Sequence, residues 1–425
     1  MTDLNEWLAR AHAAWPGLDA VADGTAGLRN AILGLWSLMA EAPPNIRDLY
    51  RGLDEATLVT QADAAARSDG FPPLPWPCTT PETRDGFWRV MAVTLRALEI
   101  RLAALSDGGT IRRGEQCRAT YGAVDAYIVS LRPRHRVPAT GHSFRRRGLV
   151  GLRVLPLALP EFRMRVRFVE DPVDRPDPVD GLLMGAALFT DFEFDIEDTV
   201  GGFLIRGATS PDHLGGIERA VRRADGDGCL SLMLPELTVD SGTLQSIQDR
   251  LANGAWEVEQ LCILVAGSRH VDLGAGCVNV TTVLDRYGAE VAAHAKLFRY
   301  NEGEGPHEDI VLGDTLEVLV PPDAVLAFGI CLDFCNTAEP SPYPWLDVDY
   351  VLVPSCGGLS TMRGHVDRSS ELLRTMRTRS LVVQQHYGPH PTESPPLGYV
   401  LARAGGNAPS AEELATSDTW MLVRL

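Results

Sequence analysis

The sequence predicts an α/β domain in its C-terminal part, preceded by a mainly helical N-terminal region. From about Gly181 onward, short apolar runs alternate with amphipathic segments, which is typical of strands and helices that follow one another along the chain. The earlier residues instead carry apolar side chains at three- and four-residue spacing. Between the two lies Asp171–Gly181, a stretch rich in Pro and Asp that has little to bury and therefore predicts a domain boundary.

Residues 1–110 form the predicted helical region. Leu28–Glu41 and Trp88–Leu105 each have the periodicity of an amphipathic helix. The prolines of Phe71–Pro81 interrupt the region between them, because proline cannot continue a helix.

Residues 111–180 are expected to be a connector with a basic cluster, a strand segment and the linker. The cluster, Arg132–Arg147, holds six arginines and two histidines in sixteen residues, which suits either a local site for an anion or partner or a solvated connector. The strand segment is Phe162–Phe168, where apolar and basic residues alternate.

Residues 181–425 carry the alternating elements. Two helices are expected, at Pro211–Ala224 and His365–Ser380. The strands are expected in eight apolar runs: Leu182–Phe189, Cys229–Leu237, Leu261–Ser268, Val278–Asp285, Ala289–Leu297, Ala324–Asp333, Asp349–Cys356 and Ser380–Gly388.

The composition is that of an ordinary folded protein, with 45% apolar and 22% charged residues in 425. A formal charge of -17 argues against general binding to nucleic acid and against adhesion to anionic membranes. Eight cysteines at no regular spacing indicate reduced thiols rather than a disulfide framework. With no signal-peptide pattern and no apolar stretch approaching 18 residues, we expect a cytoplasmic protein.

Three polar residues interrupt apolar runs at the expected ends of strands: Glu236, Lys296 and Cys331. Cysteine-based hydrolysis of a C–N bond needs a thiol, a base to activate it, and a fixed positive donor for the developing oxyanion. Singly, each residue has a plainer interpretation, as a solvated strand end, a surface lysine or a small core residue. Their order and context favour the catalytic interpretation.

With that context, the chain resembles the nitrilase superfamily of carbon–nitrogen hydrolases. LMLPEL is similar to the family's strand that ends in Pro-Glu, which makes Glu236 the general base. The stretch with Asn279 and Gly288 resembles the hairpin before the catalytic lysine, here Lys296. FGICLDF resembles the nucleophile elbow, which assigns Cys331 and Asp333, and DYVLVPS matches the strand that follows.

This resemblance implies a four-layer α-β-β-α sandwich over residues 181–425, assembled as a homodimer or a higher oligomer. It also implies hydrolysis of an amide or carbamoyl compound, or of a nitrile, through a thioester on the cysteine and without a metal or organic cofactor. The backbone N–H of Leu332 would assist Lys296 at the oxyanion. The family's second glutamate has three candidates in NEGEGPHED, namely Glu302, Glu304 and Glu308, of which we favour Glu304.

Alternatives remain open from the sequence. After the elbow the chain reads FCNTAEPSPYPW, where the family usually continues with an aromatic-Pro-Glu segment. One alternative is therefore a non-catalytic scaffold or sensor that acts with the N-terminal region, which could bind a protein partner. Another is an acyltransferase in which an amine resolves the thioester. Cys331 and Cys335 lack the second pair that a zinc site needs, and Ala224–Cys229 is better interpreted as a helix-to-strand turn than as a calcium loop.

Overall fold

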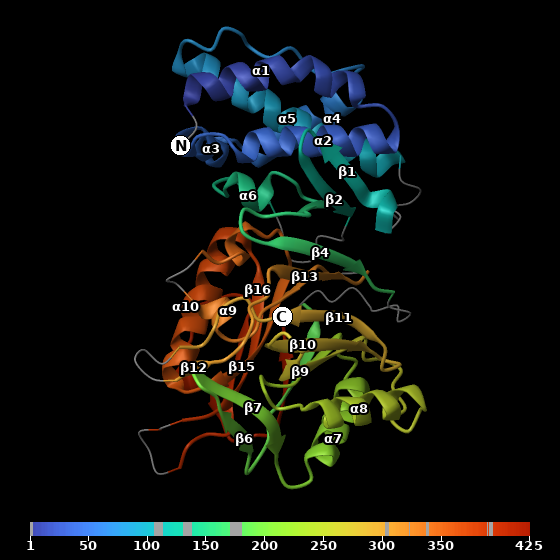
Figure 1. The fold of residues 1–425 in the computed structure, drawn as a ribbon. Coiled ribbons are helices and arrows are strands. Elements are labelled where there is room, and N and C mark those ends of the chain that lie inside the picture. Colours follow the sequence, from blue (N-terminus) through green and yellow to red (C-terminus); the bar gives the residue numbers. More distant parts are fainter. Residues whose placement is uncertain are drawn as a thin grey trace. The chain divides into compact units, whose positions relative to one another are not determined.

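The computed structural model describes residues 3–105, 114–130, 138–170, 181–301, 306–322, 324–336, 340–388, 390 and 394–425. The chain divides into two compact units, Met1–Ala158 and Leu159–Leu425 (Figure 1). The predicted linker falls largely on residues 171–180, which lie outside the described residues.

The first unit is built mainly from helices. Asp3, Asp23 and Asp54 cap the N-termini of α1, α2 and α4, because each aspartate accepts a hydrogen bond from a backbone N–H of the first turn. The longest helix, α5, packs against α2, α3 and α4. The helices predicted around Leu28–Glu41 and Trp88–Leu105 correspond to α2 and α5. The bounds of these helices are α1 (Leu4–Val21), α2 (Gly24–Ala40), α3 (Pro44–Gly52), α4 (Glu55–Ala66) and α5 (Pro81–Leu105).

Part of the predicted connector completes this unit. After the short 3-10 helix η2 (Gly114–Cys117), the strands β1 (Arg118–Tyr121), β2 (Val124–Ser130) and β3 (Leu152–Pro156) form an antiparallel sheet, on which α2 packs. The basic cluster is described only from Pro138 onward. Its last member, Arg147, ends helix α6 (Phe144–Arg147), is fully buried and forms an ion pair with Glu55. This arginine therefore holds the unit together.

The second unit contains two large sheets. The first has the order β11-β10-β9-β8-β5-β19, and the second has the order β18-β17-β16-β15-β14-β13-β4. Their strands are β4 (Arg163–Phe168), β5 (Leu183–Ala187), β8 (Ser231–Met233), β9 (Ile263–Asp272), β10 (Cys277–Asp285), β11 (Glu290–Ala295), β13 (Thr315–Val320), β14 (Leu326–Phe328), β15 (Tyr350–Gly357), β16 (Arg379–His386), β17 (Gly398–Arg403), β18 (Ala415–Thr416) and β19 (Trp420–Arg424).

The two sheets face each other across one apolar core. Met184, Val265 and Val283 of the first sheet share this core with Phe328 and Leu352 of the second. On its other face, the first sheet packs against α7 (His213–Gly226) and α8 (Ser241–Ala252). On the outer side of the second sheet, α10 (Leu359–Met376) packs against β15, β16 and β17. The predicted four-layer α-β-β-α sandwich is therefore confirmed (Figure 1).

Two local expectations have different outcomes. The segment Ala224–Cys229 is a turn, since α7 ends at Gly226 and Gly228 takes a positive φ of 69° before the chain enters β8. The strand segment Phe162–Phe168 was expected in the connector, but it forms β4 of the second unit. It pairs in parallel with β13 over six register positions, from Arg163 opposite Thr315 to Phe168 opposite Val320.

A third, small sheet has the order β12-β7-β6, with β6 (Glu193–Asp198), β7 (Gly202–Thr209) and β12 (His307–Glu308). The sequence did not indicate the hairpin β6–β7. Among the described residues, no helix has the length and apolar character needed to cross a membrane.

Candidate active site

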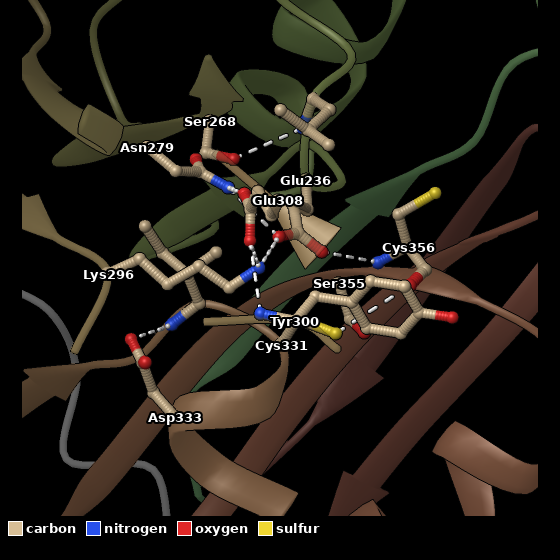
Figure 2. A network of polar contacts seen from close by, with 12 residues as sticks. Glu236, Ser268, Asn279, Lys296, Tyr300, Glu308, Cys331, Asp333, Ser355 and Cys356 are labelled. Atoms are coloured by element: carbon tan, nitrogen blue, oxygen red, sulfur yellow. Dashed lines mark hydrogen bonds and ion pairs between the residues drawn. The ribbon is translucent and has the colours of Figure 1, made fainter. Parts of the chain in front are cut away.

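Glu236 lies just beyond β8 and is almost completely buried. Its Oε1 accepts hydrogen bonds from Lys296 Nζ at 2.8 Å and from Asn279 Nδ2 at 3.1 Å. Its Oε2 accepts a hydrogen bond from the backbone N–H of Cys356 at 3.0 Å. These contacts fix both carboxylate oxygens inside the unit, so Glu236 is not a solvated strand end (Figure 2).

Lys296 follows β11 and is equally buried. Its backbone N–H donates to the carbonyl oxygen of Asn279 at 2.8 Å, which holds the end of β11 against β10. Its ammonium group lies between two carboxylates, 2.8 Å from Glu236 Oε1 and 2.7 Å from Glu308 Oε2. A lysine in this position is part of an internal charge cluster rather than of the surface.

Glu308 is the second glutamate that the structure brings to the lysine. Its Oε1 accepts hydrogen bonds from Asn279 Nδ2 at 2.8 Å and from His270 Nε2 at 2.9 Å. The other ring nitrogen of His270, Nδ1, accepts a hydrogen bond from the backbone N–H of Ile205 at 2.7 Å. Nε2 must therefore carry the ring hydrogen and donate the hydrogen bond to Glu308. The sequence favoured Glu304, but Glu302 and Glu304 lie outside the described residues, and Glu308 makes the contacts expected of this role.

Cys331 stands at a strained turn immediately before the four-residue helix α9 (Leu332–Cys335). Its backbone angles, φ 46° and ψ -103°, are unusual for a residue other than glycine, and such strain costs on the order of 1–3 kcal/mol. The turn is held because the N–H of Cys331 donates to the carbonyl oxygen of Pro354 at 3.0 Å. Gly329 is required just before it, since a Cβ there would lie 2.2 Å from the hydroxyl of Tyr343. The segment in which the sequence predicted an elbow is therefore a sharp turn between β14 and α9.

Asp333 ties the elbow to the end of the lysine strand. Its Oδ1 accepts the backbone N–H groups of Leu297 at 2.8 Å and Phe298 at 2.9 Å, the two residues that follow Lys296. Its Oδ2 accepts the N–H of Ile330 at 2.9 Å, the residue before Cys331. One buried carboxylate therefore fixes the position of Cys331 relative to Lys296 (Figure 2).

The two glutamates differ in protonation. Burial, reinforced by the charge of Glu308, raises the pKa of Glu236 above its usual range, against the opposing effect of Lys296 and a hydrogen bond with Cys331. Burial also opposes ionisation of Glu308, but Lys296 and the hydrogen bond from His270 hold its pKa below the usual range. Carboxylates whose pKa values diverge in this way suit different tasks. Glu236 can exchange a proton, whereas Glu308 retains its charge.

The pKa values of Lys296 and of the Cys331 thiol are shifted by the same neighbouring charges. Burial lowers the pKa of Lys296, but the carboxylates of Glu236 and Glu308 overcome this effect and raise it well above the usual value. Burial and the neighbouring Glu236 raise the pKa of the Cys331 thiol well above its usual value, although Lys296 and a hydrogen bond with Ser355 act in the opposite direction. The resting cysteine is therefore a thiol, with its Sγ 3.6 Å from the carbonyl oxygen of Cys356.

Among the described residues, no three His, Cys, Asp or Glu side chains are grouped so that they could hold a metal ion.

Asn279 and His270 were not predicted as site residues. Asn279 was noticed only as part of the family's hairpin, and His270 lies within an ordinary strand, β9, with no pattern that marks it.

No protein-family model matches the sequence, and no curated protein does. Among solved structures, the chain is similar to an amidase from Nesterenkonia sp., at 19% identity over 58% of this chain and 90% of the amidase, with a TM-score of 0.41. A variant of that amidase in complex with butyramide gives 18% identity, 58% and 91% coverage, and a TM-score of 0.42. A further variant, described as an amidase from the nitrilase superfamily, is 18% identical over 58% of this chain and 92% of the amidase, with a TM-score of 0.41.

The chain thus resembles amidases of the nitrilase superfamily. Because the identities and TM-scores are low, its activity has to be deduced from its own side chains. Glu236, Lys296 and Cys331, which the sequence proposed from three separate strand ends, lie together in one buried cluster.

Proposed function

We propose that this protein is a carbon–nitrogen hydrolase that cleaves an amide or carbamoyl compound through a thioester on Cys331. The observation that carries the proposal is the buried ammonium of Lys296, held between Glu236 and Glu308 beside a cysteine on a strained turn. A buried charge cluster costs stability unless every member is paired. Catalysis of this kind gives a reason to maintain that cluster next to a thiol.

In the first half of the reaction, Glu236 takes the proton of Cys331 and the thiolate attacks the carbonyl carbon. Cys356 links the two groups, because its N–H donates to Glu236 Oε2 at 3.0 Å and its carbonyl oxygen accepts from Cys331 Sγ at 3.6 Å. Lys296 and the backbone N–H of Leu332 stabilise the oxyanion of the tetrahedral intermediate. Glu236 then returns its proton to the leaving amine, the C–N bond breaks, and an acyl thioester remains on Cys331.

In the second half, Glu236 removes a proton from water, and the hydroxide attacks the thioester. The carboxylic acid leaves, and the proton held by Glu236 regenerates the thiol. Glu308 keeps its negative charge throughout and holds Lys296 in place, since its own pKa is depressed. All these groups belong to the chain itself.

The first experiment is a panel of small amides and carbamoyl compounds, including butyramide, with release of ammonia as the measurement. Cys331→Ala should reduce turnover by at least about 10³-fold, because groups that act as one unit lose most of the effect when any one is removed. Cys335→Ala is the matched control, since this neighbouring cysteine ends the short helix α9, which begins directly after Cys331. Hydroxylamine added during turnover should divert the thioester to a hydroxamate.

The alternatives give different results in the same experiment. Turnover that requires an added amine acceptor would indicate the acyltransferase. Substantial activity in Cys331→Ala, or no hydroxamate from an active preparation, would rule out the thioester mechanism.

A further inference from the structure

Ser355 lies near the C-terminal end of β15 and is completely buried. Its hydroxyl oxygen is 3.0 Å from His365 Nε2 and 3.3 Å from Gln384 Oε1. The residues on either side of Ser355 both accept hydrogen bonds from Cys331, whose N–H donates to the carbonyl oxygen of Pro354 at 3.0 Å and whose Sγ donates to that of Cys356 at 3.6 Å (Figure 2). The Ser355 hydroxyl therefore has two polar side-chain partners and belongs to the segment that contacts Cys331, and the mechanism above uses neither Ser355 nor His365.

Proton counting limits how these groups can be arranged. Both hydrogens of Gln384 Nε2 are used, on the carbonyl oxygens of Gly357 at 3.0 Å and Gly358 at 2.9 Å, so the amide orientation is fixed and Oε1 faces Ser355 as an acceptor. The single hydroxyl proton of Ser355 can then go to Gln384 or to the sulfur of Cys331. Since this proton is used for one of these two acceptors, it cannot also go to His365. His365 must therefore donate to the serine oxygen through Nε2–H.

His365 is held in a fixed position for that donation. It is completely buried in α10, and its ring stacks on Phe334 of α9 with the ring centroids 5.9 Å apart. Burial lowers its pKa to about 3, so the ring is neutral at neutral pH and keeps one N–H. Nδ1 of this ring has no hydrogen-bond partner among the described residues, which is consistent with the proton being on Nε2.

We propose that the Ser355 hydroxyl donates a hydrogen bond to the Cys331 thiolate during catalysis, and that His365 is the positioning residue that orients this hydroxyl. The proposal rests on the function proposed above. It adds a further group that stabilises the sulfur anion, and this group comes from β15, a different strand from those that carry Glu236 and Lys296.

The donation follows from the transfer of the cysteine proton. In the resting state, the Cys331 thiol donates to the carbonyl oxygen of Cys356, and the Ser355 hydroxyl donates to Gln384. When the thiol proton moves to Glu236, the sulfur becomes an anionic acceptor. The Ser355 proton then rotates to the sulfur, because hydrogen bonds to an ionised acceptor are roughly twice as strong as those between neutral groups.

The ionisable groups that face Cys331 are Glu236, Lys296 and the thiol of Cys335. Ser355 and neutral His365 add no charge to this set. A substitution at Ser355 should therefore shift the ionisation of Cys331 by the loss of one hydrogen bond, without changing the charge of the cluster.

The test is the pH dependence of Cys331 alkylation by iodoacetamide in the full chain, followed by peptide mapping. In Ser355→Ala, the rate profile should move to higher pH by about one unit, equivalent to a rate about tenfold lower at each pH on the rising limb. Ser355→Thr keeps the hydroxyl and should stay close to the wild type. Ser380→Ala is the matched control, since this buried serine of the adjacent strand has no hydrogen-bond partner for its hydroxyl among the described residues.

The histidine is tested in parallel. His365→Leu should move the profile in the same direction as Ser355→Ala, whereas His365→Gln, whose amide N–H can replace Nε2–H, should move it less. If Ser355→Ala does not fold, the two His365 variants still test whether an oriented Ser355 hydroxyl favours the Cys331 thiolate.

The outcomes separate the two proposals. If Cys331 is the fastest of the eight cysteines but Ser355→Ala keeps the wild-type profile, the role of Ser355 is refuted and the hydrolase proposal is unaffected. The positioning role of His365 is refuted in the same way if His365→Leu and His365→Gln behave alike. If wild-type Cys331 reacts no faster than the buried Cys229 and Cys262, the hydrolase proposal itself loses its nucleophile.

Discussion

Substitution of Glu308 by Gln tests which carboxylate holds the lysine. The change removes one negative charge and almost no volume. Both oxygens of Glu308 accept hydrogen bonds, Oε1 from His270 and Asn279 and Oε2 from Lys296. Whichever way the new amide turns, its NH₂ group therefore faces a donor, and a hydrogen bond is replaced by a repulsive contact.

The magnitude follows from the geometry. Breaking a buried ion pair by removing one partner costs about 3–5 kcal/mol, and we expect the lower end because Lys296 keeps Glu236 at 2.8 Å. The charge of Glu308 raises the pKa of Glu236, so its removal should lower that pKa and weaken the base. We therefore expect kcat/KM to fall by about 10²-fold, a loss typical of general acid–base catalysis. The acid limb of its pH profile should move to lower pH.

The assay is the pH dependence of kcat/KM on the best amide of the panel, with urea unfolding of the same variants. Glu304→Gln is the informative comparison, because the sequence favoured Glu304, whereas the structure shows Glu308 in contact with Lys296. If Glu304→Gln lost activity while Glu308→Gln kept its rate and its acid limb within twofold, the assignment of the second glutamate from the structure would be wrong.

Three further predictions concern stability. Asp333→Ala leaves three backbone N–H groups without their acceptor and should cost about 3–5 kcal/mol in urea unfolding, whereas the exposed Asp314→Ala should cost less than about 1 kcal/mol; equal costs would contradict the bridging role. Because the folded-state pKa of His365 is about 3 against an unfolded value of 6.5, the stability this residue provides is lost as pH falls from 6.5 to 3, so His365→Gln should be less acid-sensitive by about 4–5 kcal/mol, and identical acid unfolding curves would refute this. Since β4 pairs with β13, a fragment 159–425 should be more stable than 181–425 in thermal unfolding, and the reverse order would favour the boundary predicted from sequence.

The sequence could indicate Glu236, Lys296 and Cys331 because each is polar and interrupts an apolar run at the end of a strand. That signal is local, and it does not depend on what the neighbouring strands contribute. Asp333 was indicated by the resemblance of FGICLDF to the family's elbow, but its hydrogen bonds to Leu297 and Phe298 depend on tertiary structure.

Choosing among the three glutamates required non-local information. Glu308 is fixed because β12 pairs with β7, where Glu308 lies opposite Phe203, and because His270 of β9 reaches the same carboxylate. Nothing in NEGEGPHED indicates pairing with a strand about 100 residues upstream, so the sequence could not distinguish Glu308 from Glu302 and Glu304.

The same limitation applies to β4 and to the hairpin β6–β7. The Pro- and Asp-rich stretch after β4 suggested a domain boundary, and the parallel partner of β4 lies about 150 residues later in the sequence. Strand β6 alternates apolar and acidic residues around Phe194 and Ile196, but it is mostly exposed and was not recognised as a strand. The sequence therefore indicated that β4 is a strand but not that it belongs to the second unit, and it also missed the buried strands β13 and β17.

The raised pKa of Cys331 constrains how the site can work. A buried thiol that stays protonated at neutral pH supplies few thiolates at rest, so the nucleophile has to be formed during the reaction. The pKa of Glu236 is also raised, which brings the base closer to the thiol and lowers the cost of moving a proton between them. Lys296 remains positive beside both groups and favours the thiolate once it forms. The depressed pKa of Glu308 keeps it from competing for that proton, which leaves Glu236 as the base and Lys296 as the donor in the mechanism we propose.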